Sequence, residues 1–469
     1  MNTASSIHPD FAAFETAYKK GTPQFVWTKR VADLETPVSA VLKLREKGLP
    51  CFLLESVEGG EVRGRYSIIG LAPDLIWECR GTQAKITPAS PQFPPSNDPM
   101  DSLQSLLDSM QMEIPEGLPP MAGAMIGYAG FNMIKLVEKL PNEKPDTIGI
   151  PDACFLRPSI TVVFDSVDGV ISVIAPCWYD AKLHAKASYD AAVNRISHIL
   201  EKLEKPLSAG LGYKPAAPKK RDFQPNMTRE AFGGMVEKAK EYIRAGDIFQ
   251  VVLSQRFSAD FTEDPIAFYR SLRHTNPSPF LFYLDLVDYA LVGSSPEILV
   301  RLRDDVVTIR PIAGTRKRGK TREEDIALEK DLLADPKEIA EHLMLLDLGR
   351  NDVGRCTLPG TVQVTSHMQV ERYSHVMHIV SNVEGRRDPK RTAFECLMSG
   401  FPAGTVSGAP KIRAMEIIDE LEPISRSFYA GSVGYFLRQW PDGQRITLRT
   451  ALIKDGKIYV QSGGASSPT

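Results

Sequence analysis

The chain has 469 residues, 43% of them hydrophobic, with 56 basic and 58 acidic side chains and a formal net charge of −2. This length allows two or three ordinary domains or one large composite domain, and the apolar content allows a sizeable core. Because the charges nearly balance, no field of one sign favours nucleic acid or an anionic membrane as a partner.

The cysteines and the N-terminal sequence bear on the compartment. The six cysteines are scattered and form no CxxC pair, so neither a zinc site nor a disulfide framework is indicated. The first residues lack the apolar segment of a secretory signal, and no run of about 18 apolar residues follows. We therefore expect a soluble cytoplasmic protein without a membrane span.

The first part of the chain is expected to form short strands and helices. Apolar runs next to glycine predict strands, and apolar side chains at helical spacing predict helices. Two apolar runs that flank Asp168-Gly169 predict a hairpin. Strands are expected at 50–56, 64–70 and 123–130, the hairpin at 159–175, and helices at 11–20, 101–110 and 189–203.

Residues 205–226 have the composition of a linker. They include four prolines, two glycines and the basic cluster Lys219-Lys220-Arg221. Such stretches separate domains, and the basic cluster is expected to be solvated. We therefore expect an N-terminal region at 11–204, a linker at 205–226 and a catalytic region at 227–469.

The second part of the chain alternates helices with pairs of strands. The pairs do not follow a strict strand–helix–strand rhythm, which favours an α+β fold with largely antiparallel sheets and helices outside. Strands are expected at 248–257, 279–286, 289–302, 306–312, 427–437, 445–454 and 457–461, and helices after Thr228, Asp264 and Thr321 and at 390–398 and 410–421.

Residues 335–355, DPKEIAEHLMLLDLGRNDVGR, are expected to hold the centre of the chemistry. Asp335 is a candidate N-cap, Pro336 fits the first helical position, and Glu338 completes a capping box. Gly349 is expected to end the helix. The expected buried stripe consists of Ile339, Leu343 and Leu346.

A second face of this helix carries Glu338 and Glu341. The helix is too apolar for the surface, so Glu341 is expected to be partly buried and to need a cation or hydrogen-bond donors. Taken alone, the stretch favours a buried helix whose charges satisfy one another, since structural ion pairs are common.

Four other positions carry candidate chemistry. Glu297 has apolar flanks that would raise its pKa and make it an acid, although a solvated strand-edge glutamate is the alternative. The loop 404–411 enters a helix at Pro410 and offers backbone N–H groups to an anion. Arg449 lies within an apolar strand and needs a carboxylate partner. His378 has apolar neighbours, where a histidine is usually a satisfied core residue.

Together these positions predict a pocket with two requirements. Arg449 and the Thr405 loop suit an anionic substrate. Glu341 suits a hard divalent cation, and the absence of nearby cysteine or histidine pairs favours Mg²⁺. Glu297 and Glu341 are expected to open onto one cavity.

Eight motifs that match in order resemble the family of anthranilate synthase large subunits among the chorismate-utilising enzymes, and the resemblance covers residues 11–461. They are LLES (53–56), GRYSIIG (64–70), NPSPF (276–280), GSSPE (293–297), RPIAGTRKRG (310–319), AEHLMLLDLGRNDVGR (340–355), GTVSGAPK (404–411) and GSVGYF (431–436).

Two positions separate this family from its neighbours. Gln250 stands where the isochorismate and salicylate synthases have a lysine that activates water. Glutamine is no base, so ammonia is the expected nucleophile. Ala313 stands where many aminodeoxychorismate synthases have a lysine, and alanine there favours anthranilate as product.

The resemblance implies a reaction and its residues. Ammonia replaces the 4-hydroxyl of chorismate by attack at C2, and pyruvate is then eliminated to leave anthranilate. Glu297 matches the acid, Glu341 a Mg²⁺ ligand and His378 a histidine near the reacting ring, with Arg449 on the enolpyruvyl carboxylate. The positions that match substrate contacts are Gln250, Gly314, Thr315, Thr405, Tyr429, Arg449, Gly463 and Gly464.

The resemblance also implies partners. A separate glutamine amidotransferase subunit supplies the ammonia, because this chain has no glutamine-hydrolysing cysteine motif. Tryptophan inhibits the family's large subunit. Its pocket matches Glu55, Ser56, Pro279, Phe280 and Leu281.

One departure from the family lies at the end of the sequence. The family continues past a Gly-Ala-Gly turn with a strand and an acidic helix, whereas here the matching turn is Gly463-Gly464-Ala465 and no carboxylate follows Asp455. The second Mg²⁺ ligand is missing, so we expect weak metal binding, impaired catalysis, an open sheet edge and exposed apolar surface.

Two alternatives remain open. Within the family, the chain would be the aminating subunit of aminodeoxychorismate synthase. In a different class, it would be a non-catalytic subunit that binds tryptophan.

Overall fold

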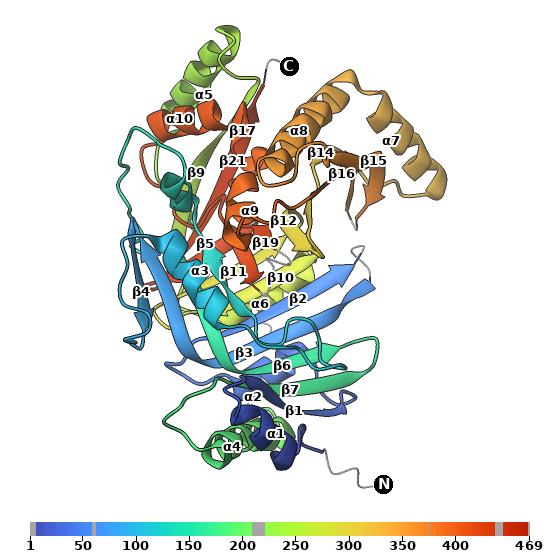
Figure 1. Ribbon diagram of the computed structural model, residues 1–469. Helices are drawn as coiled ribbons and strands as arrows, with labels where there is room; N and C mark the ends of the chain where they lie inside the picture. The colour runs from blue at the N-terminus through green and yellow to red at the C-terminus, as the bar shows by residue number, and fades with distance from the viewer. Residues whose placement is uncertain (1–5, 59–61, 209–220, 374, 437–443, 468–469) are drawn as a thin grey trace.

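A computed structural model describes residues 6–58, 62–208, 221–373, 375–436 and 444–467 (Figure 1). Strands and helices occur along the whole chain. The helices are α1 (Phe11–Tyr18), α2 (Pro37–Leu44), α3 (Pro99–Ser109), α4 (Ala185–Glu204), α5 (Arg229–Arg244), α6 (Pro265–Thr275), α7 (Arg322–Ala334), α8 (Pro336–Gly354), α9 (Ala393–Gly400) and α10 (Lys411–Leu421), with short 3₁₀ turns η1 (Phe131–Leu136) and η2 (Gly404–Val406).

The strands of the first half are long. They are β1 (Gln24–Val31), β2 (Cys51–Glu58), β3 (Val62–Arg80), β4 (Gln83–Thr87), β5 (Met125–Ala129), β6 (Ala153–Asp165), β7 (Val170–Cys177) and β8 (Gln224–Pro225).

The strands of the second half are shorter and more often interrupted. They are β9 (Gln250–Asp260), β10 (Phe280–Asp285), β11 (Tyr289–Ser295), β12 (Ile298–Arg303), β13 (Val306–Ile309), β14 (Ile312–Lys317), β15 (Gln363–Arg372), β16 (Val376–Arg386), β17 (Gly408–Ala409), β18 (Ser432–Phe436), β19 (Gln444–Ile446), β20 (Thr450–Lys454) and β21 (Lys457–Ser466).

Every strand pairing among the described residues is antiparallel, and the strands form two connected ladders. One runs β1–β7–β6–β3–β2–β10–β11–β20–β21–β9. The other runs β4–β3–β6–β5–β18–β19–β12–β13–β16, with β14 and β15 also on β16. The expected α+β class with antiparallel sheets is confirmed.

Strands β3 and β6 belong to both ladders. The first half of β3 pairs with β2 and its second half with β4, while β6 pairs with β7 at one end and with β5 at the other. Ala72 has a φ of 44°, and the register shifts between Pro73 and Leu75. Such an irregularity bends a strand, so β3 passes from one ladder into the other. The expected short strand at 64–70 is therefore wrong in length.

The helices cover the outside of the ladders (Figure 1). Helices α1, α2 and α4 lie together near the N-terminus beside β1 and β7. Helices α5 and α10 pack on β9, α9 packs on β12, and α8 packs on β14 and β16. None of the helices in the described part of the chain is both long and apolar enough to cross a bilayer.

Strands from both sides of the expected linker pair with one another. β2 pairs with β10, and β5 pairs with β18. The division at 205–226 remains a prediction. Residues 209–220, which include Lys219 and Lys220 of the expected basic cluster, lie outside the described residues.

Glycines in and next to strand β5 allow neighbouring backbone segments to approach closely. A Cβ added to Gly127 would lie 1.9 Å from the carbonyl oxygen of Cys154 on β6, and one added to Gly130 would lie 2.6 Å from the carbonyl of Ser427. The expected close approach of backbones at 123–130 is confirmed, and no residue with a side chain fits there.

Helix α8 begins as expected and ends later. The Asp335 carboxylate accepts from the N–H groups of Lys337 and Glu338. Glu338 does not cap in return, because its carboxylate binds Arg316 at 2.9 Å. The helix runs through Gly349, which is buried against Pro311, to Gly354.

The expected buried stripe of α8 is also wrong in part, because Leu343 is 46% exposed. The residues that it buries are His342, Leu345, Leu346, Gly349, Asp352 and Val353.

Three expected strands are broken. The run 289–302 divides at Pro296-Glu297 into β11 and β12, and 306–312 divides at Pro311 into β13 and β14. Proline cannot donate to a ladder, which explains both breaks. The run 445–454 divides into β19 and β20 around Arg449, whose φ is 49°.

Candidate functional site

Glu297 lies in the break between β11 and β12, and its side chain is almost fully buried. The Thr405 hydroxyl, on turn η2, lies 3.2 and 3.1 Å from its two carboxyl oxygens. Among the described residues no cation pairs with it. Burial raises the pKa of Glu297 to about 8, although the Thr405 hydrogen bond lowers it. Glu297 is therefore protonated at neutral pH and can act as an acid, as its apolar flanks predicted.

His378 lies on β16, opposite Thr315 of β14. Its Nδ1 is 3.1 Å from the Gly314 carbonyl oxygen and 3.0 Å from the Thr315 hydroxyl. A carbonyl only accepts, so Nδ1 carries the proton and Nε2 presents a lone pair. Burial lowers the pKa of His378, and the charge of Arg449 lowers it further, against the Gly314 bond.

Gly314 occupies a position that only glycine fits. Its φ is 75°, and an added Cβ would lie 3.2 Å from a carboxylate oxygen of Glu338. The Gly314–Thr315 segment thus lies between the His378 ring and the N-terminal turn of α8. The sequence missed this role of Glu338, since strands β15 and β16 and their pairing to β14 were not predicted.

Arg449 lies in the break before β20 rather than within a strand. The carbonyl of Arg449 accepts from the N–H of Ser294, and its side chain donates to the Ser278 hydroxyl at 3.2 Å. No carboxylate pairs with it in the described part of the chain. Burial lowers the pKa of Arg449. A half-buried guanidinium without an internal anion has donors left for the carboxylate of a ligand.

Gly463 and Tyr429 lie together. Both expected turn glycines, Gly463 and Gly464, belong instead to strand β21, where Gly463 pairs with Ser254 of β9. A Cβ added to Gly463 would lie 2.7 Å from the Tyr429 hydroxyl, whereas one on Gly464 would meet open space. Tyr429 is buried beside Arg426. The far part of β21, residues 461–466, pairs with β9 alone among the described strands.

Glu341 faces a different space. It is half-buried on α8. Burial raises the pKa of its carboxyl, and the negative charge of Glu338 raises that pKa further. With Gln250 it lines a cavity of about 780 Å³. Two apolar side chains at the rim of this cavity are exposed, Phe249 to 64% and Leu343 to 46%.

The donor set around Glu341 suits Mg²⁺ only in part. No cluster of three or more histidine, cysteine or acidic side chains that could hold a metal occurs among the described residues. Mg²⁺ commonly uses one or two carboxylates and completes its shell with water and substrate oxygens. Glu341 supplies one carboxylate that opens onto a cavity, as that pattern requires, whereas the raised pKa of its carboxyl opposes the ionised form that binds a cation.

Glu297 and Glu341 do not open onto one cavity. Glu297 lines a small cavity of about 30 Å³ together with Thr405, and the larger cavity belongs to Glu341. The one residue that lines both is Leu348. The expectation of one shared cavity is therefore wrong in this structure. The physical reason is helical geometry, since two neighbouring stripes of α8 face the two cavities and Leu348 stands between them.

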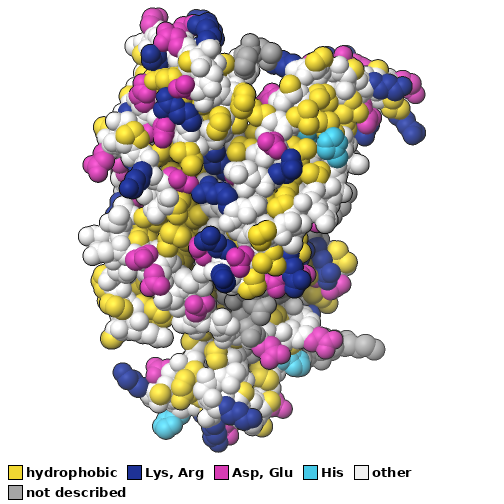
Figure 2. All heavy atoms as spheres, turned by 45° about the horizontal axis from the view of Figure 1, so that its top comes forward, with side chains coloured by type: hydrophobic (Ala, Val, Ile, Leu, Met, Phe, Trp, Pro, Cys, Tyr) yellow, Lys and Arg dark blue, Asp and Glu magenta, His cyan; other side chains and the backbone are white. Residues whose placement is uncertain are grey.

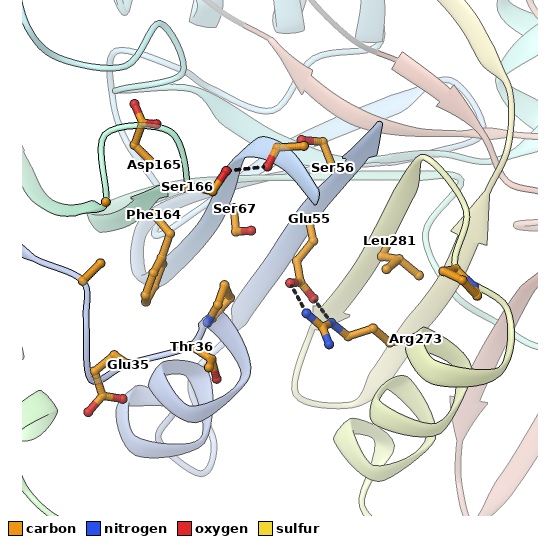
Figure 3. A pocket seen from close by; sticks show the side chains of 15 residues that line it. Glu35, Thr36, Glu55, Ser56, Ser67, Phe164, Asp165, Ser166, Arg273 and Leu281 are labelled. Atoms are coloured by element: carbon orange, nitrogen blue, oxygen red, sulfur yellow. Dashed lines mark hydrogen bonds and ion pairs between the residues drawn. The ribbon is translucent and has the colours of Figure 1, made fainter. Parts of the chain in front are cut away.

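A further cavity of about 360 Å³ lies beside β2 and β10 (Figure 3). Glu55, Ser56 and Leu281 of the expected tryptophan pocket line it, and Pro279 and Phe280 do not. Leu281 faces the cavity, so its strand neighbour Phe280 points to the other side of the sheet.

The Glu55 carboxylate in this cavity accepts from Arg273 at 2.7 and 3.0 Å and from the Tyr269 hydroxyl. Sequence reasoning missed Arg273 and Ser67, which follow from pairing of β2 with β3 and β10. Figure 2 shows that basic and acidic side chains intermingle over one face of the molecule, without a large region of one sign.

Comparison with known proteins decides the family. Residues 49–465 match the model of the chorismate binding enzymes. The chain belongs to the chorismate-binding enzyme family. It is 52% identical, over 97% of its length and 92% of the relative's, to anthranilate synthase component 1 of Cereibacter sphaeroides. It is 45% identical to the Pseudomonas putida protein of that name, over 92% of this chain and 88% of that one.

Solved structures agree on the fold. Anthranilate synthase component I from Streptococcus pneumoniae TIGR4 is 38% identical with a TM-score of 0.77, and the alignment covers 93% of this chain and 94% of that one. MenF, the menaquinone-specific isochorismate synthase of Escherichia coli, has a TM-score of 0.69 at 19% identity and shares the fold. The expected resemblance to anthranilate synthase large subunits is confirmed.

Proposed function

We propose that this protein is the aminating subunit of anthranilate synthase, a cytoplasmic lyase that converts chorismate and ammonia to anthranilate and pyruvate in tryptophan biosynthesis. Full-length similarity to proteins named anthranilate synthase component 1, at up to 52% identity, carries the proposal. Gln250 supports amination over hydration, because its buried amide is no base for water.

The residues suggest how the substrate is held. The Arg449 guanidinium binds the enolpyruvyl carboxylate, helped by Ser278. The Nε2 lone pair of His378 faces the ring and can accept a proton during the elimination of pyruvate. The Tyr429 hydroxyl and the Gly463 backbone close one side, where a larger residue would not fit.

Glu297 supplies the proton that makes the 4-hydroxyl leave as water. Ammonia adds at C2, the ring double bonds shift, and the C4–O bond breaks as the oxygen takes the Glu297 proton. A buried neutral carboxyl suits this step, because it donates at neutral pH and excludes water from the leaving group. Mg²⁺ held by Glu341 would bind a substrate carboxylate and withdraw charge from the ring.

Ammonia comes from a separate glutamine amidotransferase subunit in this proposal. The term component 1 in the relatives' names supports a second component.

Product analysis tests the function. Purified protein is mixed with chorismate, ammonium and Mg²⁺, and anthranilate is followed by its fluorescence. We expect anthranilate and pyruvate in equal amounts without any added enzyme. Fluorescence that appears only after a lyase is added identifies an aminodeoxychorismate synthase. Tryptophan binding without turnover identifies a non-catalytic subunit.

The pKa of Glu297 sets a pH dependence. The protonated carboxyl of Glu297 is the active form, so kcat falls above pH 8, approaching tenfold per pH unit, as the pKa of about 8 is passed. The measurement is kcat against pH at saturating chorismate and saturating ammonia, calculated from the NH₃ concentration. A kcat that stays level to pH 10 contradicts the assignment of Glu297 as the acid.

Tryptophan inhibition is proposed for the cavity of Glu55, Ser56 and Leu281. The Glu55 carboxylate suits an ammonium group, Arg273 suits a carboxylate, and Phe164 offers an apolar wall. Its volume of about 360 Å³ suits a ligand of amino acid size.

Filling this cavity should weaken inhibition by tryptophan and spare catalysis. Ser67, on β3, lines the cavity. We expect Ser67→Leu, which places a larger side chain in the cavity, to weaken tryptophan binding at least tenfold, which is about 1.4 kcal/mol, with anthranilate formation unchanged. Calorimetry and the fluorescence assay measure the two effects, and Ser67→Ala, which adds no bulk, is the control. Unchanged tryptophan affinity in Ser67→Leu places the binding site elsewhere.

A further inference from the structure

Lys411 and Asp352 form a buried ion pair between the two cavities of the candidate site. The Lys411 ammonium donates to a carboxylate oxygen of Asp352 at 2.7 Å and to the Gly400 carbonyl at 2.9 Å. Their side chains are 5% and 6% exposed. Lys411 lines the large cavity of Glu341, and Asp352 lines the small cavity of Glu297. The ion pair thus lies between the large cavity and the small cavity and connects them.

The second carboxylate oxygen of Asp352, Oδ1, is buried and has no hydrogen-bond partner among the described residues. A buried polar oxygen without a partner is costly, and structures usually satisfy it with an ordered water. The small cavity that Asp352 shares with Glu297 has about 30 Å³, which is room for a water molecule. Glu297 and Thr405 offer that water polar partners at the other end.

The proposed reaction requires that Glu297 be reprotonated after every turnover. Each turnover removes the proton of Glu297, and the buried carboxyl must regain one before the next chorismate reacts. The hydroxyl of Thr405, its hydrogen-bond partner, is only part-buried, but it can give a proton to Glu297 only by taking another in its place. While substrate or product covers the small cavity, the proton has to reach Glu297 from another side.

We propose that Lys411 and Asp352 are a proton relay that recharges Glu297 from the large cavity. This inference rests on the proposed role of Glu297. An ammonium proton of Lys411 passes to Asp352 Oδ2, and rotation of the neutral carboxyl brings that O–H to the side of the small cavity. The water there accepts this proton and gives one of its own to the Glu297 carboxylate. Lys411 then regains a proton from water in the large cavity. The ammonia that adds to the ring releases one proton per turnover, so the cycle balances without a further reactant.

The electrostatics of the pair support transfer within it. Burial raises the pKa of Asp352 and lowers the pKa of Lys411, each toward the other, against the effect of the ion pair itself. Groups whose pKa values approach each other exchange a proton with little change in free energy. The charges of Arg355 and Glu138, which pair at 2.8 Å, also act on the two groups.

Hydrogen–deuterium exchange at the Glu297 carboxyl tests the relay in the resting protein. At neutral pH the protonated carboxyl gives an infrared band, assigned by its loss in Glu297→Gln, that shifts on mixing with D₂O. The variant Asp352→Asn/Lys411→Met removes both charges at similar volume. We expect the shift to be at least tenfold slower in this variant than in the unaltered protein. An equal rate overturns the relay.

Two further variants separate the relay from the fold. Arg355→Met removes the neighbouring ion pair and leaves the path intact, so its exchange rate should not change. Lys411→Gln keeps hydrogen bonds to Asp352 and Gly400 and replaces the double variant if that one does not fold. It too should exchange at least tenfold more slowly, and a normal rate counts against the relay.

Turnover gives a second readout. In the double variant the first turnover should keep its rate, because Glu297 starts protonated. Later turnovers should be at least tenfold slower. The time course should therefore show a burst of one anthranilate per active site. A purely structural defect slows the first turnover as well and produces no burst. If the unaltered protein makes no anthranilate, the proposed function fails, whereas the exchange result still decides whether the path exists.

Discussion

The Glu297→Gln variant is expected to form anthranilate about 10²–10⁴-fold more slowly than the unaltered protein, the range that a positioned general acid contributes. The amide keeps the size of the carboxyl and its hydrogen bond with Thr405 and has no proton to give to the leaving hydroxyl. The loss should lie in kcat, with KM for chorismate changed little, since the neutral carboxyl and the amide offer similar contacts.

The same variant provides a control for folding. The pKa of Glu297 is higher in the folded protein than in the unfolded chain, so its neutral form stabilises the fold at low pH and that contribution is lost as pH rises from about 4.5 to about 8. Glutamine has no such loss. We expect the variant to be at least as stable as the unaltered protein at pH 9. A kcat within threefold of normal would falsify the role of Glu297 as acid.

Replacement of Arg449 has the second large effect. We expect Arg449→Met to lower kcat/KM for chorismate by about 10²–10³-fold, because loss of one partner of a desolvated charge pair costs roughly 2–5 kcal/mol. Arg449→Lys should recover only part, since an ammonium cannot form two parallel bonds with a carboxylate. Ser278→Ala, which frees the guanidinium from its hydrogen bond, should show a smaller loss of the same kind.

The matched control is Arg413→Met. Arg413 is a partly exposed arginine on α10 that pairs with Asp247 and Glu416 on the surface. Its removal should leave kcat/KM unchanged. The assignment of Arg449 to the substrate fails if Arg449→Met and Arg413→Met have the same kinetics while both remain folded by circular dichroism.

Local features of this fold could be predicted from the sequence where neighbours in the chain decide them. The Asp335 cap of α8, the Thr228 cap of α5 and the close approach at Gly127 follow from residue types at fixed spacing. The raised pKa of Glu297 follows from its apolar flanks. The residues that determine the two caps and the pKa of Glu297 lie within a few positions of one another in the chain. The close approach at Gly127 is predicted by glycine itself, without knowledge of the segment that lies opposite.

The features that were missed depend on distant pairings. The positive φ of Arg449 breaks a run of apolar residues that looks like one strand. The tautomer of His378 depends on Gly314, which is 64 residues away. The separation of Glu297 from Glu341 depends on the side of α8 that packs on β13, β14 and β16, and the apolar residues of that helix occur on more than one face, so spacing alone does not choose the side.

A structure with Mg²⁺ and an unreactive chorismate analogue is the most direct test of whether one substrate reaches both acidic groups. We predict that the enolpyruvyl carboxylate contacts Arg449, that the carbon bearing the 4-hydroxyl faces Glu297, and that the ring carboxylate points toward Glu341 with the Leu348 side chain turned out of the wall between the cavities. An analogue bound wholly within the cavity of Gln250 and Glu341, out of reach of Glu297 and Arg449, would contradict the account.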